Sequence, residues 1–578
     1  MMNLSLTNSR ARAYFTVLAC LVATSGIHAF QPWLVRRIAA HRPLSILYDT
    51  TPPGLDECRL DDEGEALNDC LVNEGYTADD HEELFVTKIY KAKLEHLGSR
   101  FKSSNKSNQK VEFTKPQLPP RFSNNTYVSA ASKETNSHVF DLQYSHLMTD
   151  DDIVLVDCVR RPNMQPVSRA FVRAGPRAAL HFDPPMVNAA IVTCGGLCPG
   201  LNNVVRELVH ALYYIYGVNS VWGVRGGFHG FHADVGDEDF YPVLLTPEKV
   251  QDIHHEGGTV LRSSRGGFDI DKILDFLTKK NIQQLYVIGG DGTHRGAYAI
   301  HQACMKSDLN VAIAGIPKTI DNDVDYIDRS FGFLTAVQAA QASIHSAKTE
   351  ATCVMPNGVT VVKLMGRSAG FLAATSALGS GDVDAVLVPE VPIVLDGDDG
   401  ILPFIYHRCK EQKYAVVVVA EGAGEDILGK STQVDKGGNR KLPPIGEFIR
   451  DQIKDYFTAK GEDSTVRYID PSYTVRSVPA NAADSIYCTD LAQNAVHGTM
   501  AGYTGFSVGL INNQCCYIPI PQLVATSPRQ MNPRGQIWER VLAMTGQPNP
   551  ISHKQEKNNA HEITETSDHL QTTEPNIF

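Results

Sequence analysis

Two loops in the middle of the chain hold the residues best suited to chemistry. Residues 289–293 read Gly-Gly-Asp-Gly-Thr, and residues 317–323 read Pro-Lys-Thr-Ile-Asp-Asn-Asp. Glycine lets a backbone approach a phosphate closely and aim N–H groups at it, while aspartate can bind a divalent cation or accept a proton. The two loops together therefore predict chemistry on a phosphate group, assisted by a metal ion or a carboxylate base.

The elements that must position these loops are short strands. Each loop directly follows a β-branched or aliphatic run, and the carboxyl ends of neighbouring parallel strands are where open α/β sheets bind ligands. Helical patterns at 203–216 and 335–349 alternate with the strand runs. This alternation predicts right-handed βαβ units, and hence an α/β fold of two Rossmann-like lobes with mostly parallel sheets and the active site in the cleft between them. The predicted core strands are 189–193, 285–288, 311–316, 359–364, 385–388 and 415–420.

Composition limits the class of protein. A chain of 578 residues with 43% hydrophobic and 20% charged residues is that of a globular protein with two or three domains. The net charge of −12 argues against a general binder of nucleic acid or anionic membranes, because both partners need a basic face. None of the 12 cysteines shows metal-type paired spacing. Cys194, Cys304 and Cys353 lie within or beside apolar runs, so we expect them to be buried thiols. Cys194 and Cys198 flank a glycine pair, which leaves a redox role open.

Two further glycine-rich segments could hold phosphates. Residues 193–202 follow the first core strand and open a helix, whose N-terminus suits an anion. Tight strand-to-helix turns also use glycine, so this segment alone indicates either a turn or a phosphate site. Residues 263–267 read Ser-Ser-Arg-Gly-Gly, and Arg265 taken alone could equally be a solvated loop cation.

The four motifs in this order resemble the 6-phosphofructokinase family, over about 138–548 and most closely its ATP-using plant and trypanosomatid branch. The resemblance implies transfer of a phosphoryl group from MgATP to the C1 hydroxyl of fructose 6-phosphate, the committing step of glycolysis. It implies that Asp321 is the general base, Asp291 the magnesium ligand and Asp323 a second acidic group near the metal. The nucleotide-binding residues that it implies are Gly195, Gly196, Arg265, Gly266, Gly290, Asp291, Gly292 and Thr293.

The same resemblance implies a sugar-phosphate site rich in arginine, whose planar fork suits phosphate oxygens. Arg367, in a Met-Gly-Arg motif, would face the substrate and the transition state, and Glu421 would accept hydrogen bonds from sugar hydroxyls. Tyr473 and Arg476 would bind the sugar's phosphate, and Arg467 would reach the site across a subunit interface of a homotetramer or homodimer. Taken singly, each of these could be an ordinary surface residue. The full implied set is Thr319, Ile320, Asp321, Met365, Gly366, Arg367, Glu421, Arg467, Tyr473, Thr474, Val475 and Arg476.

Some positions depart from the bacterial family pattern. Gly358 stands near the place of a second cross-interface arginine, Tyr473 replaces a histidine and Lys318 replaces a glycine. Lys318 is typical of pyrophosphate users, whereas Gly292 is typical of ATP users. An aspartate at 292 would block the α-phosphate region, so we expect ATP to be the donor.

Three alternatives to this function differ in class. A pyrophosphate-dependent phosphofructokinase is the closest of them. A non-catalytic regulatory subunit is disfavoured because the base and the metal ligand are both present, and a kinase acting on NAD or a lipid is disfavoured by the arginine set.

The first 49 residues have the features of a two-part targeting sequence. Arg10, Arg12, a short apolar run and small residues up to Ala29 are typical of a signal peptide, and the run is too short to span a bilayer well. Phe30 and the basic stretch after it resemble the transit segment of algae with secondary plastids. We therefore expect a plastid protein with no stable membrane span in the mature chain; plain secretion, an uncleaved anchor and the cytoplasm are the alternatives.

The remaining organisation follows from composition and pattern. Polar and acidic residues from 50 to 137 predict a flexible extension with one helix at 82–97. The predicted divisions after it are a lead-in at 138–186, a nucleotide-binding lobe at 187–332 to which part of 474–525 returns, a sugar-phosphate lobe at 333–473, a C-terminal helix at 526–551 and a disordered tail at 552–578.

Overall fold

The computed structural model describes residues 88–102, 147–159, 167–234, 236–429, 433 and 441–551. The chain divides into the units Met1–Glu83 and Leu84–Phe578, and every described residue belongs to the second unit. The predicted targeting sequence and the predicted tail lie outside the described residues. Within the described part of the chain, no helix is both long and apolar enough to cross a bilayer.

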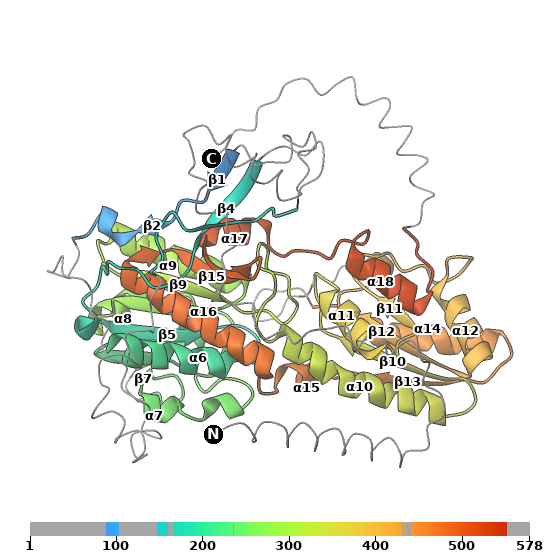
Figure 1. Ribbon diagram of the computed structural model, residues 1–578. Helices are drawn as coiled ribbons and strands as arrows, with labels where there is room; N and C mark the ends of the chain where they lie inside the picture. The colour runs from blue at the N-terminus through green and yellow to red at the C-terminus, as the bar shows by residue number, and fades with distance from the viewer. Residues whose placement is uncertain are drawn as a thin grey trace, which may run out of the picture. The chain divides into compact units, whose positions relative to one another are not determined.

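Among the described residues, the larger sheet has ten strands, and its central strands are parallel. Figure 1 shows this sheet with its helices. Strands β5, β8 and β9 end together at one edge, since Thr193 pairs with Ile288 and Gly289 with Pro317. Their residues are almost all buried, as expected of mostly apolar strands covered on both faces. The parallel strands in spatial order are β9 (Ala312–Pro317), β8 (Gln284–Gly289), β5 (Asn188–Thr193) and β6 (Ser220–Val224).

Both sides of this sheet are completed by strands of mixed direction. Beyond β9, the late strand β15 returns parallel to β9, and its hairpin partner β16 then pairs with β4. The strands added at the two edges are β15 (Phe506–Ile511), β16 (Gln514–Pro519), β4 (Val167–Arg173), β3 (Ile153–Leu155), β1 (Lys88–Lys91) and, beside β6, β7 (Val243–Leu245).

Helices cover both faces of the larger sheet because side chains alternate along each strand. Ala189 and Ile191 of β5 pack in a core with α6 (Leu201–His210) and α16 (Ala482–Ala501), which lie against each other (Figure 1). Ala190 and Val192 pack in another core with α8 (Ile270–Lys279) and α9 (Asp291–Lys306). The sheet is therefore a central layer between two layers of helices.

The smaller sheet has four parallel strands and the same layered arrangement. Its spatial order is β11 (Ala385–Leu387), β12 (Tyr414–Ala420), β10 (Gly358–Leu364) and β13 (Thr465–Ile469). Its covering helices are α10 (Phe333–Cys353) and α11 (Phe371–Ser380) on one face, and α12 (Ile401–Gln412) and α14 (Ile445–Ala459) on the other.

The predicted fold class and core strands are confirmed. The predicted helix at 203–216 is α6 followed by the π-helical turn η5 (Ala211–Tyr216), which ends where Gly217 takes φ 67°. The remaining helices of the described chain are α7 (Pro247–Val250), α13 (Glu425–Leu428), α15 (Ser472–Arg476), α17 (Ile520–Thr526) and α18 (Gln536–Thr545). Short 3₁₀ turns lie at η3 (Leu97–Ser99), η4 (Pro184–Met186), η6 (Gly227–His232) and η7 (Ile253–His255).

The helix predicted at 82–97 is wrong over its described part, where the chain forms strands. Strand β1 pairs with β4, and β2 (Glu95–His96) pairs with β14 (Tyr503–Thr504). Leu97 is buried, and Glu95 Oε2 lies 2.7 Å from Nε2 of the buried His301. Backbone pairing with the core has overridden the weak local helical pattern.

Candidate active site

Loops from both sheets enclose a cleft of about 710 Å³. The loops that follow β5, β8 and β9 supply one side, and residues after β10 supply the other. The sequence-predicted residues that line it are Gly195, Gly196, Arg265, Gly266, Gly290, Asp291, Gly292, Thr293, Lys318, Thr319, Ile320, Asp321, Asp323, Met365, Arg367 and Arg476.

The glycine loop after β5 is tied to the loop at 263–267. Gly195 takes φ 86°, donates its N–H to Ser264 O at 3.1 Å and accepts from Ser263 Oγ at 2.7 Å. A Cβ atom on Gly196 or Gly292 would meet no atom within 4 Å, so both backbones border open space. Such open, glycine-rich backbone allows a phosphate to approach N–H groups.

The N-terminus of α9 points into the same cleft, with Asp291 as its first residue. The buried His294 holds this turn, because its Nδ1 lies 3.1 Å from Gly290 O and its Nε2 lies 3.0 Å from Ser507 Oγ. Burial lowers the pKa of His294 to about 4, so its ring is neutral at physiological pH. The helix dipole and the free N–H groups of the first turn favour an anion at this place.

Asp321 is held in the loop after β9 with one oxygen unused. Its N–H donates to Thr319 Oγ1 at 3.2 Å, and Thr319 Oγ1 in turn donates to Asp323 Oδ1 at 2.7 Å. Oδ2 accepts from the backbone N–H of Arg367 at 3.4 Å, whereas the buried Oδ1 has no partner among the described residues. Burial, followed by the charges of Asp323 and Glu421, raises the pKa of Asp321 to about 7. A carboxylate with this pKa can accept a proton near neutral pH.

Asp291 and Asp323 form the acidic part of the cleft. Burial and the charge of Asp323 raise the pKa of Asp291 to about 6, and burial also raises the pKa of Asp323. Within the described residues there is no cluster of three or more side chains able to hold a metal. This donor set fits Mg²⁺, which commonly takes one or two carboxylates and completes its shell with substrate phosphates and water.

Cations flank these carboxylates. Lys318 is buried, and its Nζ donates to the carbonyl oxygen of Gly196. Burial, with the charges of Arg265 and Arg476, lowers the pKa of Lys318. Arg476 packs over the ring of Tyr473 at 4.8 Å, and its buried Nε has no partner within the described chain.

Some predicted residues lie outside the lining of the cleft, as far as the described chain shows. Arg467 is 56% exposed, with its Nε 3.4 Å from Glu350 Oε1, and the side chain of Tyr473 is 72% exposed. Thr474 Oγ1 donates to Pro471 O at 2.9 Å, and Val475 is fully buried in the core. The others outside the lining are Gly366 and Glu421.

The predicted burial of the cysteines is confirmed for Cys194 and Cys304 and is wrong for Cys353. Cys194, Cys198 and Cys304 are buried free thiols, but Cys353, which ends α10, is exposed against expectation. Burial raises the pKa of Cys194 and of Cys198 to about 12. Because the thiolate is the reactive form, these values disfavour the redox role left open for the pair.

Sequence reasoning missed an aromatic part of the lining. The rings of Phe228 and Phe268 meet edge to face, with centroids 5.2 Å apart, and both line the cleft. Phe268 follows the 263–267 motif directly, which was a usable signal. Pro528 comes from a distant segment, and its place in the lining has no signal in the sequence. The lining residues that were missed are Cys194, Leu197, Phe228, Ser264, Phe268, Arg295, Gly296, Ala299, Val324, Ser368 and Pro528.

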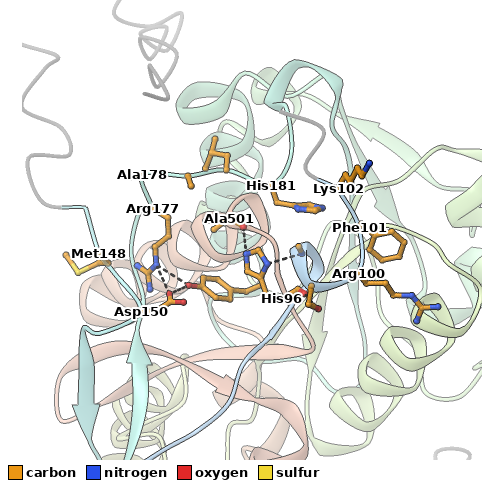
Figure 2. A pocket seen from close by; sticks show the side chains of 15 residues that line it. His96, Arg100, Phe101, Lys102, Met148, Asp150, Arg177, Ala178, His181 and Ala501 are labelled. Atoms are coloured by element: carbon orange, nitrogen blue, oxygen red, sulfur yellow. Dashed lines mark hydrogen bonds and ion pairs between the residues drawn. The ribbon is translucent and has the colours of Figure 1, made fainter. Parts of the chain in front are cut away.

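A second cavity of about 660 Å³ lies where the residues at 96–102 meet the core (Figure 2). Its central polar groups already bond to protein atoms. His96 Nε2 lies 2.8 Å from Ala501 O, Arg177 donates to the carbonyl oxygens of Arg173 and Gly175, and Tyr503 donates to Asp150. The His96 bond attaches the residues at 96–102 to the end of α16.

Comparison with known proteins agrees with this geometry. The family model described as Phosphofructokinase matches residues 188–499. ATP-dependent 6-phosphofructokinase 1 of Arabidopsis thaliana is 47% identical over 408 residues, which cover 70% of this chain and 84% of that protein. ATP-dependent 6-phosphofructokinase 4, chloroplastic, of the same plant is 48% identical over 384 residues, covering 65% of this chain and 71% of that protein.

More distant relatives extend the agreement. The ATP-dependent 6-phosphofructokinase of Trypanosoma brucei brucei is 40% identical over 398 residues, covering 67% of this chain and 80% of that protein. The crystal structure of a pyrophosphate-dependent phosphofructokinase from Marinobacter aquaeolei superimposes with a TM-score of 0.51 at 19% identity, covering 63% of this chain and 92% of that one. The last likeness shows the fold alone.

Proposed function

This chain belongs to the phosphofructokinase family, and we propose that it is an ATP-dependent 6-phosphofructokinase with Asp321 as its general base. It transfers the terminal phosphoryl group of ATP to the C1 hydroxyl of fructose 6-phosphate in glycolysis. The observation that carries the role of Asp321 is its buried Oδ1, which no other described residue bonds, in the cleft that the glycine loops also line. With a pKa of about 7, Asp321 accepts the hydroxyl proton as the oxygen attacks phosphorus.

The nucleotide's phosphates lie against the glycine loops and the start of α9. Gly195 and Gly196, Arg265 and Gly266, and Gly290 to Thr293 surround the phosphate oxygens with glycine-rich backbone and one guanidinium. The N–H of Gly195 itself is bonded to Ser264 O, so Gly195 contributes close approach and not a donor. Phosphoryl transfer has a loose transition state, so alignment and charge neutralisation supply most of the catalysis.

A Mg²⁺ ion belongs to this arrangement. Asp291 would hold it, with Asp323 beside it. Burial raises the pKa of both carboxyl groups, and the charge of Asp323 adds to the shift of Asp291, so a cation would favour their charged forms. When bound, the ion supplies positive charge to the donor phosphates.

The sugar phosphate occupies the side of the cleft formed by the smaller sheet. Arg367 neutralises the transferring group, and Arg476 with Tyr473 binds the phosphate already on the sugar. Glu421 accepts hydrogen bonds from sugar hydroxyls, and Thr319, Ile320, Met365, Gly366, Thr474 and Val475 shape the site around them. Support for this assignment comes from Arg367 and Arg476 in the lining and from the charge of Glu421 acting on Asp321.

ATP is the donor because Gly292 leaves space at the start of α9. Lys318, the residue typical of pyrophosphate users, is bonded to the Gly196 carbonyl and keeps its ammonium inside the cleft.

The active site is completed by a second copy of the chain. Arg467 lies on β13, at the edge of the smaller sheet, and is more than half exposed, so it is available to a neighbouring subunit. Delivery to a plastid, by the two-part sequence at 1–49, is the cellular part of the proposal.

The decisive experiment is a coupled assay of the purified chain with fructose 6-phosphate and either ATP or pyrophosphate. Activity with ATP that is lost in Asp321→Asn is expected. Equal activity with pyrophosphate would favour the rival donor, and no activity with either donor would favour a non-catalytic subunit.

A further inference from the structure

We propose that residues 527–531, here called the strap, position the catalytic loop, and that Arg529 is the positioning residue. The strap runs from α17 toward α18, about 200 residues after the catalytic loop, and its Pro528 lines the active cleft. This inference rests on the proposed role of Asp321 as base.

Arg529 holds the backbone immediately after the base. Its N–H donates to Asp323 O at 2.6 Å, and its Nη2 donates to Asn322 O at 3.3 Å. Asn322 has φ 57°, a left-handed conformation that non-glycine residues seldom adopt, and its Oδ1 accepts from Ser330 N at 2.8 Å. Arg529 Nη1 donates to Ile327 O at 3.2 Å, so one guanidinium spans the turn that carries the two carboxylates.

The start of the strap is anchored to α17. Ser527 Oγ accepts from the N–H of Asp325 at 3.1 Å and donates to Leu523 O at 2.8 Å. The turn is thus held at 322, 323, 325 and 327 by one short segment.

The other end of the strap holds the start of α11, near the arginine of the sugar-phosphate side. Met531 N donates to Glu390 Oε1 at 2.8 Å, and Gly370 N donates to the same oxygen at 2.9 Å. The Arg529 guanidinium lies 5.0 Å from the ring centre of Phe371, the next residue. Gly370 is three residues from Arg367, whose backbone N–H reaches Asp321.

The strap therefore links the two halves of the site, and its Pro528 lies at the wall of the cleft. One half carries the base, and the other carries the arginine that meets the transferring group. Misplacement of reacting groups by about 1 Å can lower a rate by about 100-fold, although each group is still present. Loss of Arg529 should accordingly act on kcat more than on binding.

The test compares Arg529→Met, which removes the two guanidinium hydrogen bonds while keeping an unbranched side chain, with Arg529→Lys, which keeps the charge and a single donor group. The backbone bond to Asp323 O remains in both variants. We expect Arg529→Met to lower kcat about 10- to 100-fold with KM for both substrates within about threefold, and Arg529→Lys to recover part of the loss. A core variant of the outer layer, Ile405→Ala in α12, serves as a control for loss of thermal stability.

A double-mutant cycle tests whether the strap is one unit. Glu390→Gln should lower kcat in the same manner, and the double variant with Arg529→Met should lose less than the product of the two single effects. If Arg529→Met does not fold, Arg529→Lys and Glu390→Gln provide the same comparison.

Three results would overturn the inference: an unchanged kcat in Arg529→Met, a kcat loss equal to that of Ile405→Ala at the same loss of Tm, or independent effects in the cycle. An unmodified chain without phosphotransferase activity would refute the proposed function itself. An active chain with any of the three results would refute the strap alone.

Discussion

Asp321 and Arg367 come from loops of different sheets, and the backbone N–H of Arg367 donates to Asp321 Oδ2 at 3.4 Å. This bond uses one carboxylate oxygen and leaves Oδ1, buried and unpartnered within the described chain, for the proton of a substrate. The base and the arginine are therefore brought into register by the backbone, and Arg367 lines the same cleft as Asp321.

Replacing Asp321 by Asn should remove the base while keeping its shape. We expect kcat to fall by about two to four orders of magnitude, the usual contribution of general-base catalysis. Binding of fructose 6-phosphate, measured by calorimetry, should change far less, because Arg367 and Arg476 remain. Near-normal turnover would show that another group takes the proton.

The positions of the catalytic loops were predictable because their signals are local. An apolar run followed by glycine and aspartate specifies both the strand and the turn after it, and the ends of β8 and β9 indeed pair at Gly289 and Pro317. The β1 and β2 strands were not predictable, since their pairing partners lie far away in the sequence and override the local pattern.

The contacts that hold the catalytic loop in place could not be predicted from the sequence either. Arg529 and Asn322 are 207 residues apart, and a contact to a backbone carbonyl places no demand on the type of the residue that accepts it. The exposure of Cys353 was also missed, because this residue ends α10 and lies outside the set of helix residues that are buried in the core.

His294 should make stability depend on pH. Burial lowers its folded pKa to about 4, below the value near 6.5 of an unfolded histidine, so the folded state favours the neutral ring. Its contribution is fully present above pH ~6.5 and is lost as pH falls toward ~4, because the unfolded chain binds the proton first. Tm of the unmodified chain should therefore fall more steeply over this range than Tm of His294→Gln; parallel curves would contradict the prediction.

Gly292→Asp should act on the donor alone. A carboxylate at the start of α9 would fill the open space beside the nucleotide phosphates and repel them. We expect ATP use to fall about tenfold or more, the factor that corresponds to ~1.4 kcal/mol. Affinity for fructose 6-phosphate is the internal control, and equal losses for both substrates would indicate a general disturbance of the loop.

A shared active site predicts complementation between inactive subunits. Arg467→Ala and Arg476→Ala should each be inactive alone, but a hybrid oligomer would contain a site with both arginines intact. Activity should return after the two proteins are mixed and subunit exchange is verified by mass or by a fluorescent label. Exchange without recovered activity would place Arg467 outside its neighbour's site.

Import into a plastid in two steps is the prediction that depends on the sequence alone, since 1–49 lie outside the described residues. Arg10, Arg12 and the apolar run should direct the chain to the secretory membrane, with cleavage near Ala29. The exposed Phe30 and the basic stretch after it should then direct it onward. A fluorescent fusion of residues 1–60, imaged in an alga with a secondary plastid, should label the plastid interior. Phe30→Ala should leave the label around the plastid, whereas cytosolic or secreted label from the intact fusion would reject this route without affecting the assignment of the enzyme.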